Sequence, residues 1–115
     1  MTTLYGIKNC DTMKKAMQWL NDQGIDYQFH DFKKAGLDEE TLKSWIKHVG
    51  WETLVNRRGT TWRKLPQHDR DTIDETKAIE LMLANLSLIK RPVLETGDGT
   101  YVGFKADQYA KIFAR

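Results

Sequence analysis

The sequence predicts an α/β domain built on a mixed, four-stranded sheet. The first third of the chain shows a strand, a helix and a second strand, whereas the last quarter shows two short strands and a closing helix. Mostly helical patterns lie between these two parts, without a repeat or a low-complexity linker. A strand, helix, strand order favours a parallel pair joined by a right-handed crossover, and the later hairpin adds antiparallel strands.

The first three elements follow from the spacing of apolar residues. Residues 2–7 are apolar and rich in Thr, Tyr and Ile, which is typical of a buried strand. After Cys10, apolar residues recur at helical spacing until Gly24, which predicts a helix. Alternation of apolar and polar residues from Ile25 onward predicts the second strand, with Phe32 as a candidate last member.

The middle of the chain is predicted to be helical. Asp38 can cap a helix that ends at Gly50, and a short turn follows. Gly59 interrupts the next segment, and Pro66 ends a further helical turn. Asp74 can cap a longer helix with an apolar inward stripe.

Two short strands and a helix are predicted to close the chain. Residues 92–95 form the first strand, and GDG at 97–99 is a turn signal. Tyr101 and Val102 begin the partner strand, and residues 106–115 space their apolar side chains as a helix.

Composition indicates a single domain, residues 1–115, in a reduced, cytoplasmic setting. The net charge of +2 is the small difference between 18 basic and 16 acidic residues, which gives no argument for nucleic acid or an anionic membrane. No signal-like segment opens the chain, and no apolar run approaches the roughly 18 residues that a membrane span needs. The single cysteine excludes an internal disulfide, and the three histidines are too scattered for a metal site. A monomer is expected because no heptad pattern occurs.

Cys10 is the first candidate for chemistry because it lies where the first strand gives way to the first helix. Unpaired backbone N–H groups at a helix start favour the thiolate. An ordinary thiol is only roughly 3% ionised at neutral pH, and lowering its pKa by about two units needs about 2.7 kcal/mol. A helix end supplies about 0.3 to 1 kcal/mol, so a further cation is required. Without one, a lone cysteine is most often a small buried hydrophobe.

Three arginines can supply that cation. Arg57 and Arg58 lie in the segment NRRGTT, where a solvated loop is the alternative interpretation. Arg91 precedes Pro92, and a residue before proline is held in extended geometry, which fixes its direction at the start of a strand. Composition alone favours the trans isomer of Pro92, because only about 5% of bonds before proline are cis in folded proteins. Guanidinium groups also bind carboxylates or oxyanions at two points, which suits an anionic substrate.

Four blocks in the same order along the chain resemble the YffB branch of the ArsC/Spx family. They are YGIKNCDTMKKA, NRRGTTWRKL, KAIELML and IKRPVLETGDGTYVGF. The resemblance implies a thioredoxin-like fold, with residues 1–33 and 87–115 as its core and residues 37–86 as a mainly helical insertion. It also implies that Pro92 is the cis-proline that faces the active cysteine in such folds.

The resemblance also assigns roles to individual residues. Cys10 matches the family's nucleophile, Arg91 matches the arginine of its RP motif, and Arg57 or Arg58 occupies the place of another arginine. Arg57 is preferred because it follows Asn56 in an NR pair. Substrate contacts are expected from Lys8, Asn9, Asp11, Thr12, Arg58 and Pro92.

Three departures from related proteins narrow the function that the resemblance implies. Gly103 stands where arsenate reductases of the family have a third arginine, and Gly6 stands where they have a histidine. Both argue against arsenate as the natural substrate. Met13 replaces the second cysteine of the C-x-x-C switch in Spx-type transcription regulators, so an internal dithiol switch is impossible.

The residues and the resemblance together predict a glutathione-dependent monothiol reductase. The Cys10 thiolate would attack an oxidised sulfur or an oxyanion, and glutathione or glutaredoxin would resolve the intermediate because no second cysteine is present. No bound cofactor is expected. The alternatives are an Spx-like regulator that docks on RNA polymerase without turnover, and an arsenate reductase.

Overall fold

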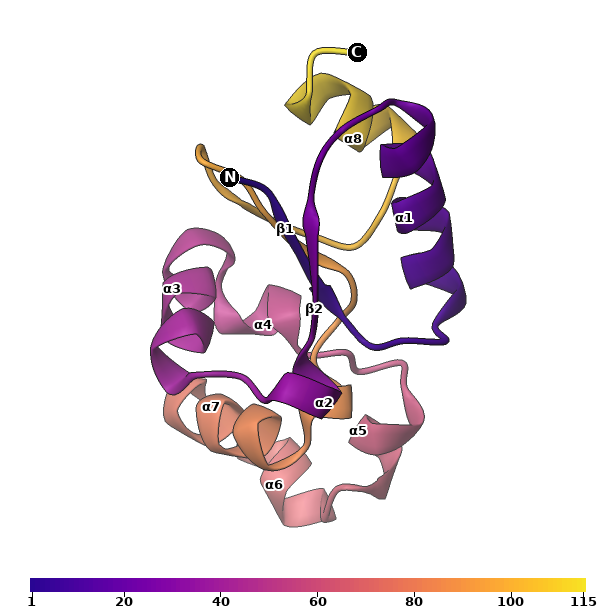
Figure 1. Cartoon of the computed structure of the whole chain (residues 1–115). Helices are drawn as coiled ribbons and strands as arrows, with labels where there is room; N and C mark the ends of the chain where they lie inside the picture. Colours follow the sequence, from indigo (N-terminus) through magenta and orange to yellow (C-terminus); the bar gives the residue numbers. More distant parts are fainter. The chain divides into compact units, whose positions relative to one another are not determined.

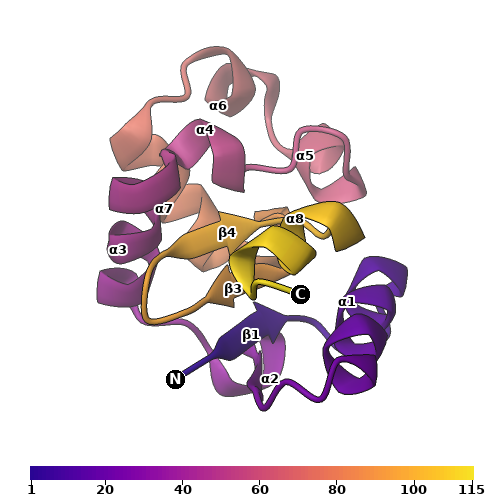
Figure 2. The same cartoon turned by 90° about the horizontal axis from the view of Figure 1, so that it is seen from above.

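Four short strands form one mixed sheet in the computed structural model, which describes residues 1–115 (Figures 1 and 2). They are β1 (Thr3–Gly6), β2 (Gln28–Asp31), β3 (Val93–Glu95) and β4 (Thr100–Val102). The spatial order is β2-β1-β3-β4, with β1 parallel to β2 and antiparallel to β3, and with β3 antiparallel to β4. The predicted α/β class and mixed four-stranded sheet are confirmed.

The chain divides into two compact units. The first unit joins Met1–Ala35 to Arg91–Arg115 and holds the whole sheet, whereas the second unit spans Gly36–Lys90. The helices of the first unit are α1 (Asp11–Asp22), α2 (Phe32–Ala35) and α8 (Ala106–Ile112). Those of the second unit are α3 (Glu39–Val49), α4 (Trp51–Leu54), α5 (Thr60–Lys64), α6 (Gln67–Asp71), α7 (Glu75–Ala84) and the short 3-10 helix η1 (Leu86–Leu88).

The core of the first unit forms between the sheet and two of its helices. On α1, Met13 and Leu20 are buried at helical spacing and join a cluster with Leu4 of β1. Helices α1 and α8 lie side by side (Figure 1), and the Trp19 ring packs edge-on against Tyr109, with 5.7 Å between ring centroids. Each large side chain buried in this way contributes about 1.5–3 kcal/mol, which holds α1 against the sheet.

Phe32, the candidate last member of the second strand, lies outside that strand. Strand β2 ends at Asp31, and Phe32 begins the short helix α2 with its side chain fully buried. The Asp31 carboxylate accepts hydrogen bonds from the backbone N–H groups of Lys33 and Lys34, at 3.0 and 3.2 Å. Asp31 therefore caps the helical turn that directly follows the strand.

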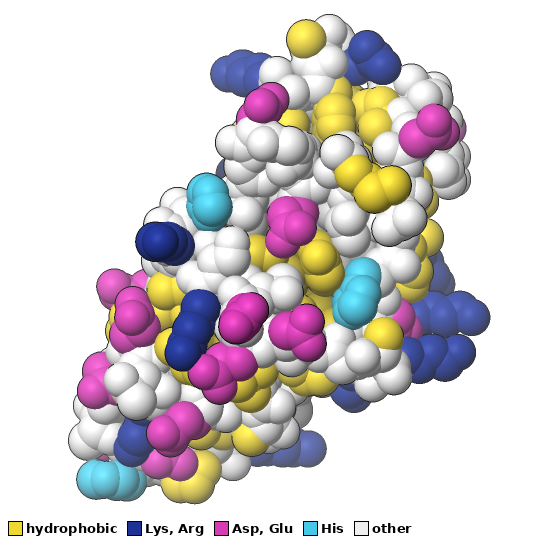
Figure 3. Space-filling view, turned by 60° about the vertical axis from the view of Figure 1, so that its left-hand side comes forward, with side chains coloured by type: hydrophobic (Ala, Val, Ile, Leu, Met, Phe, Trp, Pro, Cys, Tyr) yellow, Lys and Arg dark blue, Asp and Glu magenta, His cyan; other side chains and the backbone are white.

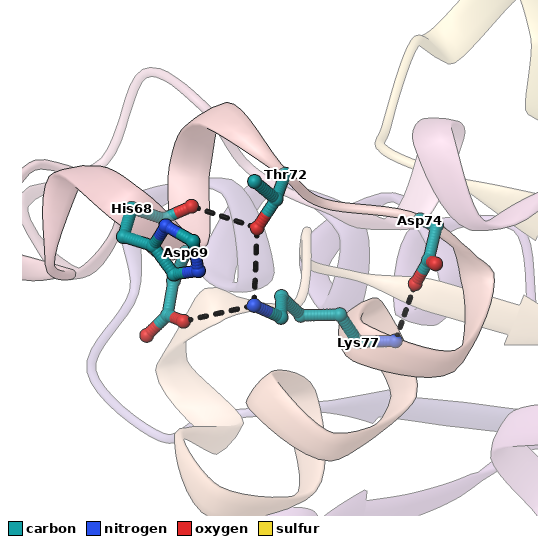
Figure 4. Close-up of polar contacts among 5 residues, drawn as sticks. All are labelled: His68, Asp69, Thr72, Asp74 and Lys77. Atoms are coloured by element: carbon teal, nitrogen blue, oxygen red, sulfur yellow. Dashed lines mark hydrogen bonds and ion pairs between the residues drawn. The ribbon is translucent and has the colours of Figure 1, made fainter.

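Two helix boundaries in the second unit agree with the expected signals. Helix α3 ends at Gly50, whose φ of 85° lies in the left-handed region that favours glycine. The Asp74 carboxylate accepts the backbone N–H of Lys77 at 2.9 Å and caps α7 (Figure 4). Asp38 stands at the N-cap position of α3, but its side chain makes no capping hydrogen bond.

Helix α6 was not predicted from the sequence, and polar contacts join it to α7 (Figure 4). Lys77 Nζ donates to Asp69 Oδ1 and to Thr72 Oγ1, both at 3.1 Å. The Thr72 hydroxyl in turn donates to the His68 carbonyl at 2.8 Å. Such a network depends on tertiary proximity, which hydrophobic periodicity does not encode.

No helix combines the length and the apolar character that crossing a bilayer requires.

On the face drawn in Figure 3, both acidic and basic side chains occur, and hydrophobic atoms form separate patches. Met1 is the large hydrophobic side chain that is most exposed.

Gly6, the last residue of β1, leaves space for the Met13 side chain. A Cβ atom at position 6 would overlap the Met13 sulfur and its terminal carbon, and Met13 is buried in the core. We expect Gly6→Ala to lower the free energy of unfolding by about 1–3 kcal/mol, measured by urea denaturation. Gly97→Ala is the control, because no atom lies within 4 Å of its added Cβ. If Gly6→Ala lowers the free energy of unfolding equally in the wild type and in a Met13→Ala background, overlap with Met13 is not the cause.

Candidate active site

Cys10 lies at the junction between β1 and α1. Its backbone is extended, with φ −103° and ψ 131°, and its carbonyl accepts the Lys14 N–H at 3.0 Å, so Cys10 is the N-cap residue of α1. Asn9 has a φ of 70°, in the left-handed region that asparagine tolerates better than most residues. Cys10 is partly exposed, so it is not a fully buried hydrophobe.

Opposing effects act on the Cys10 thiol, and their balance lowers its pKa from the ordinary value of 9.0. Burial, the largest single effect, raises the pKa because it disfavours the charged form. The Met13 backbone, the Arg91 side chain and the Thr12 backbone lower the pKa by hydrogen bonding, and the charge of Arg91 lowers it further. Met13 and Thr12 lie in the first turn of α1, where backbone N–H groups have no partner within the helix and therefore favour the charged form of the sulfur.

Strand pairing brings Arg91 to Cys10. Strand β3 runs antiparallel to β1 with Val93 opposite Tyr5, so the start of β3 lies beside the end of β1. Arg91 and Pro92 directly precede β3, and the peptide bond between them is cis, as the family resemblance implied. Pro92 is buried and Arg91 is half-buried. The guanidinium and the helix start therefore act on the same sulfur.

Arg57 and Arg58 lie in the second unit, in the loop between α4 and α5, and both are exposed. The Arg57 guanidinium lies over the rings of Trp51 and Trp62, 5.8 and 5.3 Å from their centroids, which is within the range of cation–π attraction. Arg58 anchors the loop through its backbone, because its N–H donates to Asn56 Oδ1 at 3.2 Å. The expectation that one of these guanidinium groups faces the cysteine stays a prediction.

The other predicted contact residues of the first unit flank Cys10 in sequence. Lys8, Asn9 and Asp11 are exposed, and Thr12 is half-buried. Their contact with a substrate, like that of Pro92, stays a prediction.

Two features around the predicted site residues were missed from the sequence. The first is the Met13 backbone as a donor toward the sulfur, which the N-cap position of Cys10 could have indicated, since N-cap side chains face the second and third helical N–H groups. The second is the pair of tryptophans around Arg57. The only indication of this contact in the sequence is that one tryptophan lies before the arginine pair and another lies after it.

A model of the ArsC family matches residues 5–112. The chain belongs to the ArsC family. A solved YffB protein is 56% identical to it, with a TM-score of 0.93 over 96% of this chain and 97% of the other. An arsenate reductase (ArsC) related protein from Brucella melitensis is 59% identical, with a TM-score of 0.79 over 99% of this chain and 95% of the other. The global transcriptional regulator Spx of Streptococcus mutans is 26% identical over 100% of this chain and 85% of its own length. The predicted place in the YffB branch of this family is thereby confirmed.

In this ArsC-family chain, we expect Arg91→Ala to raise the pKa of the Cys10 thiol, because it removes a hydrogen bond and a charge that favour the thiolate. Rates of iodoacetamide alkylation measured against pH report this pKa, and the variant should react more slowly at neutral pH. Lys90→Ala is the matched control, since it removes the neighbouring cation. Identical profiles of alkylation rate against pH for the wild type and Arg91→Ala would show that Arg91 does not stabilise the thiolate.

Proposed function

We propose that the protein is a glutathione-dependent monothiol reductase in which the Cys10 thiolate attacks an oxidised sulfur or an oxyanion. The observation that carries this proposal is a partly exposed thiol at the N-cap of α1, where Arg91 and the first helical N–H groups favour the thiolate. The thiolate is the attacking species in thiol–disulfide exchange, and a thiol that ionises near the ambient pH attacks best. Membership of the ArsC family, and a relative described as arsenate reductase related, support a reductase.

For a disulfide between a substrate thiol and glutathione, the proposed exchange takes two steps. The Cys10 sulfur attacks the glutathione sulfur, the disulfide bond breaks, and the substrate leaves as a thiolate that takes up a proton. A second glutathione thiolate then attacks the disulfide between Cys10 and glutathione, which regenerates Cys10 and releases oxidised glutathione. The net reaction converts the mixed disulfide and one glutathione thiol into a substrate thiol and oxidised glutathione.

The resolving thiol must come from outside the chain. Cys10 is the only cysteine, and the second position of a C-x-x-C pair holds the buried Met13, whose thioether cannot form a disulfide. Glutathione suits this role because its two carboxylates match the guanidinium groups of Arg91 and Arg57. Glutaredoxin is the other resolving partner to test.

Gly103 argues against arsenate as the preferred oxyanion. This residue, which stands in place of the third arginine of the related arsenate reductases, directly follows β4 and does not lie within the last strand. Its φ is 85°, and its N–H donates to the Pro92 carbonyl at 2.8 Å. The position beside Pro92 therefore contributes no cation to bind an oxyanion.

A transcription-regulatory role is the second candidate, because the Spx regulator of Streptococcus mutans matches the whole chain. In this alternative the protein docks on RNA polymerase without turnover. Met13 in place of a second cysteine argues against an Spx-type switch. Retention of polymerase subunits from a lysate by the immobilised protein, together with no reductase turnover, would favour the regulator.

Oxidised glutathione should form one adduct on the protein, at Cys10, which mass spectrometry detects. Free glutathione should then remove the adduct, because resolution is external. Cys10→Ser should take no adduct and should show no turnover of the mixed disulfide between glutathione and 2-mercaptoethanol. A folded wild-type protein that takes no adduct would contradict the proposal.

Arg57→Ala should lower kcat/KM for glutathione-dependent turnover by about tenfold, as expected when a hydrogen bond to a charged group is lost. Arg58→Ala should have a much smaller effect, because the backbone N–H that Arg58 uses is retained in alanine. The two variants change the net charge equally, so each controls for the other. A larger loss in Arg58→Ala would assign the role to Arg58 and not to Arg57.

A further inference from the structure

A groove of about 480 Å³ opens beside the loop that leads into Cys10. Its lining comes entirely from the first unit, from the loop before α1, from α1 itself, and from β2 and α2. One lining residue, Asn9, is bonded directly to Cys10. Small-ligand sites commonly measure about 300–1,000 Å³, so the groove can hold a few side chains of a partner.

The floor of this groove is apolar. Its accessible apolar surface comes from Ile7, Met17 and Phe29, which are half-buried, whereas Met13, also in the lining, is almost fully buried. Methionine side chains adapt their shape to what they contact, so such a floor can accept apolar side chains of different shapes. An occupant without an apolar group would leave this surface covered by water, so the floor favours a partner that brings one.

The rim of the groove is positively charged. Lys8, Lys14 and Lys34 line it, all are exposed, and none forms an ion pair with a carboxylate of the chain. The one carboxylate in the lining, Asp31, already accepts the backbone N–H groups of Lys33 and Lys34. The rim is therefore complementary to acidic groups.

We propose that this groove docks an acidic segment of a protein substrate, with one apolar side chain on the floor and carboxylates at the lysines. The inference rests on the proposed reductase and names its substrate class: a glutathionylated cysteine within an acidic sequence that also carries an apolar residue. Glutathione alone offers carboxylates but no apolar side chain for the floor. Successive residues of an extended peptide lie about 3.4 Å apart, so residues within a few positions of that cysteine can occupy the groove while its disulfide reaches Cys10.

Three synthetic peptides test the proposal, each with one glutathionylated cysteine. The first has leucine and glutamates beside the cysteine, the second has glutamines in place of the glutamates, and the third has serine in place of the leucine. We expect kcat/KM for glutathione-dependent reduction to be about three- to tenfold lower for the second and third peptides than for the first.

Charge reversal on the rim provides the matched comparison. Lys34→Glu should abolish or reverse the preference for the glutamate peptide over the glutamine peptide. Lys33→Glu changes the charge equally on the same helix but lies outside the groove lining, so it should retain that preference. Loss of the preference to the same extent in both variants would indicate a general charge effect and would overturn the groove.

A small substrate separates failure of the groove from failure of the reductase. If the protein turns over the mixed disulfide between glutathione and 2-mercaptoethanol but reduces all three peptides at equal rates, the docking proposal is refuted and the reductase is not. Absence of turnover with every substrate would refute the reductase. In that case, fluorescence anisotropy of labelled peptides with serine in place of cysteine still measures docking. Equal affinities for the three sequences would then contradict the docking proposal as well.

Discussion

The burial of the Cys10 sulfur is opposed by the groups that favour its negative charge, and the chemistry of the site depends on this balance. The N–H groups at the start of α1 and the Arg91 guanidinium prevail, so the pKa of the thiol is lowered. Both contributions follow from the fold. Helix α1 begins directly after Cys10, and the pairing of β3 with β1 places Arg91 at the same edge of the sheet. The sheet that supports the core therefore also sets the reactivity of the thiol.

A single cysteine limits the kind of reaction that the site can perform. Met13 fills the position from which a second thiol could resolve an intermediate, and its side chain occupies the space that Gly6 leaves open. A cysteine at that position would add a thiol but would also remove packing atoms from the core. The proposed dependence on an external thiol is thus linked to the packing of β1 against α1. The same helix presents Lys14 and Met17 to the groove, so one element serves both chemistry and the proposed recognition.

Local signals predicted most of the fold, and tertiary contacts explain what they missed. The junction at Cys10 and the cap at Asp74 were predictable, because a capping residue and the apolar stripe that follows it lie close in sequence. Phe32 was a candidate strand member because it is apolar and follows the second strand, but the Asp31 carboxylate caps a helical turn that begins there. In the candidate active site, residue types and the order of the motifs identified Cys10 and Arg91. The stacking of two tryptophans on Arg57 joins residues on different helices, which periodicity does not bring together.

Titration of the Cys10 thiolate by its ultraviolet absorbance tests the central claim most directly, because Cys10 is the only thiol. The folded protein is compared with the chain unfolded in urea, and Cys10→Ser supplies the background from the tyrosines in each state. We predict a lower thiol pKa in the folded protein than in the unfolded chain. An equal or higher pKa in the folded protein would contradict the claim, since burial would then outweigh Arg91 and the N–H groups of α1.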